Sequence, residues 1–186
     1  MFKVAVFVGS LRRESINRKF AKTLEKLGQP SFAFHYVELG DLPMYNDDLW
    51  ADPPASVLRL KADIASADAV LFVTPEYNRS IPPVLKNAID WATRPYGKNS
   101  WAGKPASIVG ASPGVIGTAV AQEHLRYLAT IIGLILMGQP EVYFSFKPGL
   151  VDENFEVTDE TTRQFLESYL SRFEAWISRV GEPKEA

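Results

Sequence analysis

The chain has 186 residues, of which 46% are hydrophobic and 23% are charged, and it contains no cysteine. This length and composition fit one domain with a packed core and exclude an intrinsically disordered chain. The 20 Lys and Arg residues nearly balance the 22 Asp and Glu residues, and this near balance argues against nucleic acid as the main partner. The lack of cysteine excludes disulfides, thiolate nucleophiles and Cys-based metal sites, and two distant histidines, His35 and His124, leave no predicted metal site.

The first predicted element is a strand over residues 3–8 (KVAVFV), an apolar run typical of a strand buried on both faces of a parallel sheet. Ser15 is a predicted helix N-cap, and apolar residues at helical spacing follow it up to Gly28, the predicted end. Residues 31–37 predict a second strand. Residues 38–54, rich in Asp and Pro, predict a loop.

The alternation of helices and strands continues through the middle of the chain. Apolar spacing predicts a helix near residues 57–65, and the run AVLFVT predicts a third buried strand at 69–74. Pro82 and Pro83 open another helix, because proline suits the first turn. Residues 106–110 predict a fourth strand.

The remaining elements are two helices and one further strand. Apolar residues with a 3.6-residue period predict a helix over residues 120–132. The fifth strand is either 134–137 or 142–146, and its register stays open. A continuous apolar stripe over residues 165–180 predicts a long helix that packs on the core.

Strands that alternate with helices indicate an α/β three-layer sandwich, in which helices cover both faces of a parallel sheet. Right-handed crossovers and five strands favour the flavodoxin-like strand order 2-1-3-4-5. We expect a single domain over residues 1–180 and a short C-terminal tail over 181–186.

No segment predicts export or membrane insertion. The apolar run at residues 4–8 ends at Gly9 without a basic leader or a cleavage site. The longest apolar stretch, residues 128–137, is too short to cross a bilayer. We therefore expect a soluble, cytoplasmic protein with no membrane partner.

In sheets of this order, ligands bind at the carboxyl ends of the strands where the strand order reverses. Three loops, residues 9–17, 75–82 and 111–117, are predicted to meet there. The first joins a buried strand to a helix N-terminus, where free backbone N–H groups and the helix dipole attract an anion.

The side chains of this first loop suit a terminal phosphate. The hydroxyls of Ser10 and Ser15, the amide of Asn17 and the guanidinium group of Arg12 can all donate to phosphate oxygens. The loop is neither G-x-G-x-x-G nor a Walker loop, so a monophosphate fits better than a dinucleotide. For this loop alone, an ordinary N-cap at Ser15 beside solvated arginines remains an alternative.

The other two loops suit a flat heterocycle. Residues 75–82 have proline at both ends, so their backbone amides and the Asn78 side chain can bind a ring edge while Tyr77 packs on the ring. Two glycines in residues 111–117 permit close approach of a planar ligand. The alternatives are a proline-flanked turn with solvated charges and a flexible turn.

Several motifs in this order resemble the NADPH-dependent FMN reductase family, and most of all its bacterial quinone, chromate and azo-dye reductase branch. The similar segments are GSLR at 9–12 with Ser15 and Asn17, LPMYNDDL at 42–49, PEYN at 75–78, KNAIDW at 86–91, AGKP at 102–105 and GVIG at 114–117. The resemblance covers roughly residues 3–141.

This resemblance implies a flavodoxin-like fold, bound FMN, and homodimers or homotetramers with flavin sites at the dimer interface. It implies these FMN-binding residues: Ser10, Leu11, Arg12, Ser15 and Asn17 at the phosphate, Pro75, Glu76, Tyr77, Asn78 and Arg79 along the isoalloxazine ring, and Ser112 and Gly114 on its other side. Relatives carry an Arg and a Tyr that tie the tetramer together. Val120 and Glu123 take those places here, although Glu141 is kept, so a dimer is better supported than a tetramer.

The expected activity is two-electron transfer, as hydride, from NADPH or NADH through FMN to quinones or similar acceptors such as free flavin, azo dyes or chromate. The flavin carries this chemistry, so no catalytic side chain is expected. Both substrates use one open face in turn, which predicts ping-pong kinetics. Three basic residues, Arg12, Arg13 and Arg79, favour NADPH through its extra phosphate.

The alternative is a flavodoxin-type one-electron carrier that docks on redox protein partners. Such carriers usually have a strongly acidic docking face and a phosphate loop with hydroxyls only. A net charge of −2 and the presence of Arg12 in the loop favour the reductase.

Overall fold

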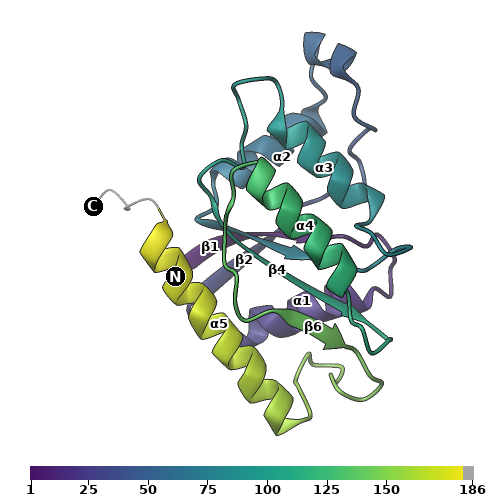
Figure 1. The fold of residues 1–186 in the computed structure, drawn as a ribbon, viewed down its shortest axis with the longest axis vertical. Helices are drawn as coiled ribbons and strands as arrows, with labels where there is room; N and C mark the ends of the chain where they lie inside the picture. The colour runs from purple at the N-terminus through teal and green to yellow at the C-terminus, as the bar shows by residue number, and fades with distance from the viewer. Residues whose placement is uncertain (182–186) are drawn as a thin grey trace.

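The computed structural model describes residues 1–181, so the expected tail lies outside the described residues except for Gly181. Within that part, the chain forms a parallel sheet in the order β2-β1-β3-β4-β5, with β6 also paired to β4 (Figure 1). The strands are β1 (Phe2–Val8), β2 (Phe32–Tyr36), β3 (Ala69–Val73), β4 (Pro105–Ser112), β5 (Ile135–Leu136) and β6 (Val142–Ser145). The predicted α/β fold and strand order are confirmed.

Two short strands share the edge of the sheet beyond β4. Ile135 of β5 pairs with Pro105 at the start of β4, whereas Val142 of β6 pairs with Val109 nearer its end. The expectation of a single fifth strand is therefore wrong, because both candidate segments are strands. At eight residues, β4 is long enough to pair with one after the other.

Helices cover both faces of the sheet (Figure 1). On one face lie α1 (Ile16–Leu27) and α5 (Glu160–Val180), and on the other lie α2 (Ala55–Ala65), α3 (Pro83–Thr93) and α4 (Ala119–Ile131). Because neighbouring strand residues point to opposite faces, Val6 packs in the layer of α1 and α5, while Phe7 packs in the layer of α2 to α4.

The helix boundaries agree with the sequence signals at most ends. Ser15 accepts a hydrogen bond from the backbone N–H of Arg18 at 3.2 Å, and Gly28 ends α1 as predicted. The apolar stripe of α5 is shorter than expected, because Phe165 is 42% exposed and burial begins at Leu166. The segment predicted as a loop contains a short 3-10 helix, η1 (Asp47–Ala51), which is too brief to show a sequence period.

Among residues 1–181, no helix combines the length and the apolar character that crossing a membrane requires.

Candidate functional site

The three loops predicted to meet do begin side by side, at the carboxyl ends of β1, β3 and β4. Backbone hydrogen bonds join these ends: the N–H of Gly9 donates to Val73 at 3.0 Å, and the N–H of Thr74 donates to Val109 at 2.9 Å. This edge is the point where the strand order reverses, so the topology places a binding crevice here.

The first loop presents unpaired backbone donors at the N-terminus of α1. None of the backbone N–H groups of residues 10–15 donates a hydrogen bond to another described residue. Ser10 and Ser15 are each 6% exposed, whereas Leu11 and Arg12 are exposed. Unpaired amides, hydroxyls and the positive end of a helix dipole are groups that bind anions, so this loop is a candidate anion site.

Asn17, one of the predicted phosphate ligands, is 2% exposed and binds the backbone at the end of β4. Its amide nitrogen donates to the carbonyl of Ala111, and its amide oxygen accepts from the N–H of Ala111, both at 2.9 Å. The side chain therefore ties the start of α1, and with it the first loop, to the beginning of the third loop.

The second loop is a tight turn with a strained backbone. Tyr77 and Ser80 exchange two backbone hydrogen bonds of 3.0 Å, and the residues between them, Asn78 and Arg79, have φ values of +50° and +61°. Two consecutive positive φ angles define a type I′ turn. Arginine seldom adopts this conformation, and strain of this kind is concentrated at functional sites.

Glu76 holds this turn against α4. Its carboxylate accepts from the backbone N–H groups of Val120 at 3.0 Å and Ala121 at 3.2 Å, and from the Arg79 guanidinium at 2.7 Å. Thr118, the N-cap residue of α4, makes no side-chain cap bond, so Glu76 supplies the missing cap. Burial by itself raises the pKa of Glu76, but these hydrogen bonds together hold it below the ordinary value.

The third loop has one glycine that faces open space and one that the chain itself requires. Gly114 lies beside Ser112, whose hydroxyl accepts from the Gly114 N–H at 3.2 Å, and both remain accessible to a ligand. Gly117 has a φ of +65°, and a Cβ there would lie 2.8 Å from the backbone of Tyr143. Glycine is therefore required at position 117 because a side chain there would clash with the backbone of β6.

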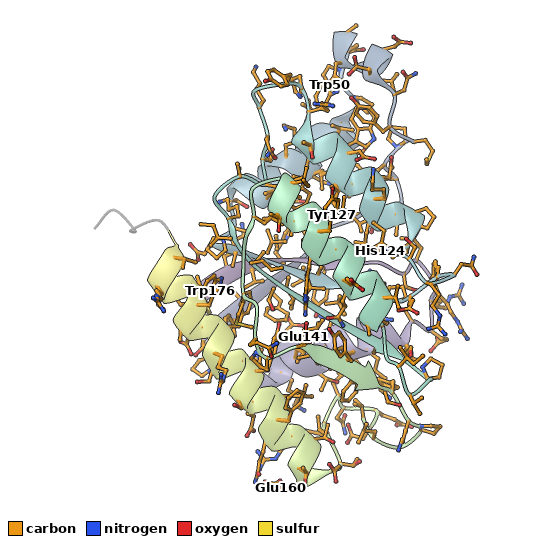
Figure 2. The ribbon with its side chains drawn as sticks, viewed as in Figure 1. Trp50, His124, Tyr127, Glu141, Glu160 and Trp176 are labelled. Atoms are coloured by element: carbon orange, nitrogen blue, oxygen red, sulfur yellow. The ribbon has the colours of Figure 1, made fainter. Side chains whose placement is uncertain are left out.

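A contact that the sequence did not indicate joins the second loop to α4. The Ser80 hydroxyl lies 3.1 Å from Nδ1 of His124, which is exposed on the outer side of α4 beside Tyr127 (Figure 2). The two residues are 44 positions apart, so no local pattern pairs them.

Side chains of α3 fix residues 42–49, another segment of the motif pattern. The carbonyl of Pro43 accepts from the Asn87 amide at 2.9 Å and from the Trp91 indole at 2.7 Å. The Asn87 oxygen in turn accepts from the N–H of Tyr45 at 2.8 Å. Asn87 and Trp91 of KNAIDW therefore anchor this loop, and Trp91 is fully buried in the core.

The assembled site offers binding groups and little catalytic chemistry of its own. The first loop suits a phosphate, while free turn amides, the half-exposed Tyr77 and the open space at Gly114 suit a flat ring. The part of the chain that the structure describes has no cluster of His, Cys, Asp and Glu that could hold a metal. These groups fit FMN, a flat ring that ends in a monophosphate.

Comparisons with known proteins agree with this assignment. The family model described as NADPH-dependent FMN reductase matches residues 2–149. The chain is 46% identical to a 2-hydroxy-1,4-benzoquinone reductase of Burkholderia sp over 175 residues, which cover 94% of this chain and 96% of the relative. It is also 46% identical to a quinone reductase of Pseudomonas putida, over 95% of each chain.

Solved structures show the same similarity. FerB, a flavoenzyme NAD(P)H:(acceptor) oxidoreductase from Paracoccus denitrificans, is 52% identical and superposes with a TM-score of 0.96 over 98% of this chain and 100% of its own. A flavodoxin from Pseudomonas aeruginosa, 21% identical with a TM-score of 0.56 over 95% and 99% of the two chains, shares the fold. With a family match over most of its length and close relatives over nearly all of it, the chain belongs to the NADPH-dependent FMN reductase family.

Proposed function

We propose that this protein is an FMN-dependent NAD(P)H:quinone oxidoreductase. The observation that carries the proposal is a site with free backbone amides and hydroxyls for a phosphorylated flat cofactor. The 46% identity to enzymes named for quinone reduction supports quinones as the acceptor class.

The roles proposed for the loops follow from their contacts. Ser10, Leu11, Arg12 and Ser15 surround the FMN phosphate, with Asn17 behind them. Pro75, Glu76, Tyr77, Asn78 and Arg79 form the turn along the isoalloxazine ring, and Ser112 and Gly114 lie on its other side. FMN, when bound, supplies hydride acceptance and donation. Within this arrangement Asn17 and Glu76 act as positioning residues, since their side chains already bind the backbone of β4 and α4.

We propose further that the nicotinamide donor and the acceptor occupy the same open side of the site in turn, which gives ping-pong kinetics. Free flavin, azo dyes and chromate remain candidate acceptors beside quinones. Initial rates at varied NADPH and benzoquinone should give parallel double-reciprocal lines. Intersecting lines would contradict sequential use of one face.

The experiment that tests the reductase itself is an anaerobic titration of the FMN-loaded protein with NADPH and with NADH, followed by visible absorbance. Loss of the oxidised flavin spectrum in one two-electron phase is the expected result. Tight FMN binding without a response to either nicotinamide would instead favour an electron carrier that docks on a protein partner.

Residues 1–180 are proposed to act as one FMN-binding domain, because both core clusters pack on a single sheet.

We also propose that two such chains form a homodimer through the face of α4. Tyr127 and Ile131 are 70% and 67% exposed there, on the same helix as His124, which contacts the second loop. Glu141 pairs with Arg126 of its own chain at 3.2 Å, and a homotetramer is the alternative assembly. Analytical ultracentrifugation of the FMN-loaded protein measures this oligomeric state.

A further inference from the structure

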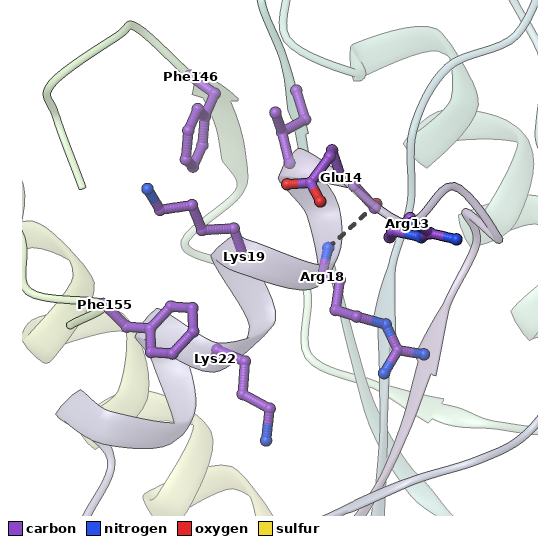
Figure 3. A pocket seen from close by; sticks show the side chains of 9 residues that line it. Arg13, Glu14, Arg18, Lys19, Lys22, Phe146 and Phe155 are labelled. Carbon is purple, nitrogen blue, oxygen red and sulfur yellow. Dashed lines mark hydrogen bonds between the residues drawn. The ribbon is translucent and has the colours of Figure 1, made fainter. Parts of the chain in front are cut away.

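A pocket of about 510 Å³ opens beside the first two turns of α1 (Figure 3). It adjoins the first loop and extends away from the three strand ends, toward the segment that follows β6. Its lining combines basic side chains with two aromatic rings: Arg13, Glu14, Ser15, Ile16, Arg18, Lys19, Lys22, Phe146 and Phe155.

The charge of this pocket favours an anion. Four cationic side chains line it against one carboxylate, Glu14. Two of the four are engaged, since Lys22 pairs with Glu25 at 2.8 Å and Lys19 donates to the carbonyl of Val151 at 2.9 Å.

The other two cations, Arg13 and Arg18, form no hydrogen bond or ion pair through their guanidinium groups with any residue in 1–181. The guanidinium of Arg18 lies over the Tyr36 ring, 5.9 Å from its centroid. Two available guanidinium groups match phosphate oxygens in geometry as well as in charge.

The aromatic wall is held in place by contacts with α1. Phe155 is 36% exposed and has a φ of +64°, a left-handed conformation that is strained for a residue with an aromatic side chain. Lys19 and Lys26 fasten its loop to the helix, Lys26 through the carbonyl of Asn154 at 3.0 Å. Figure 3 shows Lys19 between the rings of Phe146 and Phe155. The fold therefore presents an exposed ring beside a cationic surface.

We propose that this pocket binds the phosphorylated adenosine half of NADPH. Arg13 and Arg18 pair with the 2′-phosphate, and Phe155 packs against the purine. The pocket shares Arg13, Glu14 and Ser15 with the predicted FMN phosphate loop, so the two sites adjoin. This inference rests on the proposed function, because it requires a nicotinamide nucleotide as electron donor.

The test measures binding and kinetics of the FMN-loaded protein. Calorimetry with 2′,5′-ADP reports on the pocket without turnover, and 5′-AMP and inorganic phosphate are the comparison ligands. The variants are Arg18→Gln and the double variant Arg13→Gln/Arg18→Gln. Arg172→Gln removes the same charge from an exposed position on α5 and serves as the matched control.

We expect 2′,5′-ADP to bind the parent protein and Arg172→Gln equally, and the double variant about tenfold more weakly, since two charge-assisted hydrogen bonds are lost. The KM for NADPH should rise by about the same factor at constant kcat. The KM for NADH, which lacks the 2′-phosphate, should change less than about twofold. Phe155→Ala should weaken 2′,5′-ADP more than it weakens inorganic phosphate.

Three outcomes would overturn the inference while the reductase proposal stands: unchanged 2′,5′-ADP affinity in the double variant, equal losses for NADPH and NADH, or inorganic phosphate binding as tightly as 2′,5′-ADP. Failure of both nicotinamides to reduce the bound flavin would overturn the proposed function, and this inference with it. Circular dichroism melting curves of all variants exclude misfolding as the cause of a loss.

Discussion

Replacing Asn17 with alanine separates two roles for this side chain. The sequence predicts Asn17 as a phosphate ligand, whereas in the structure its amide makes two 2.9 Å hydrogen bonds with the backbone of Ala111. If Asn17 mainly supports the backbone of Ala111, Asn17→Ala destabilises the protein even without FMN. If Asn17 mainly binds the phosphate, the substitution weakens FMN binding and leaves the stability of the FMN-free protein unchanged.

The structure sets the size of the effect. Asn17 is 2% exposed, so its removal leaves the N–H and the carbonyl of Ala111 without their side-chain partner in a dry environment. A buried polar group that loses its partner costs about 1–3 kcal/mol. Two backbone groups of Ala111 are affected, so we expect a loss of about 2–6 kcal/mol in the free energy of unfolding.

Urea unfolding of the FMN-free protein measures this loss directly, and an FMN titration of the folded variant measures the change in affinity. Asn154→Ala is the control, because Asn154 is exposed and its side-chain amide makes no hydrogen bond to a described residue. That variant should stay within about 0.5 kcal/mol of the parent. A FMN-free Asn17→Ala protein that unfolds like the parent, yet binds FMN more than about tenfold more weakly, would refute the positioning role.

Three further changes test other contacts. The pKa of Glu76 is held below 4.5, so its carboxylate stabilises the fold above that pH and loses the contribution as the pH falls through the lower native value. The stability difference between the parent and Glu76→Gln should therefore narrow in acid, as followed by urea midpoints; a difference that stays constant with pH would contradict this. Arg79→Gly should be about 1 kcal/mol more stable to urea than Arg79→Ala, because both lose the guanidinium but only glycine relieves the positive φ. Lys61→Met should lower the free energy of unfolding by about 1–3 kcal/mol relative to Lys98→Met, because the Lys61 ammonium donates to three carbonyls around the C-terminal end of α3. Equal thermal midpoints for the two variants would show that those hydrogen bonds contribute little.

The strands and helices could be predicted because each depends on a local pattern. β3 has no polar residue and β1 has only Lys3 near its start, which leaves burial on both faces as the stable arrangement for the rest of each strand. The edge of the sheet could not be predicted in the same way. β5 has two residues and β6 has four, and only the length of β4 decides that both can pair with it.

Topology predicts where the site lies, and the three loops do begin side by side there, but the contacts of their side chains depend on residues far away in the sequence. Asn17 and Ala111 are 94 positions apart, and Glu76 and Val120 are 44 apart. Amides and carboxylates bind phosphates, rings and helix ends with the same atoms, so residue type alone does not distinguish a ligand from a support.

The hydrogen bonds that Asn17 and Glu76 make within the protein change which atoms are available to a cofactor. The amide of Asn17 and the carboxylate of Glu76 are engaged within the protein, while the backbone N–H groups of residues 10–15 remain unpaired. We therefore expect main-chain donors to hold the phosphate, and no side-chain substitution removes them. Loss of one hydroxyl, as in Ser10→Ala, should then weaken FMN binding less than Asn17→Ala or Glu76→Gln, which release the loops that carry those donors.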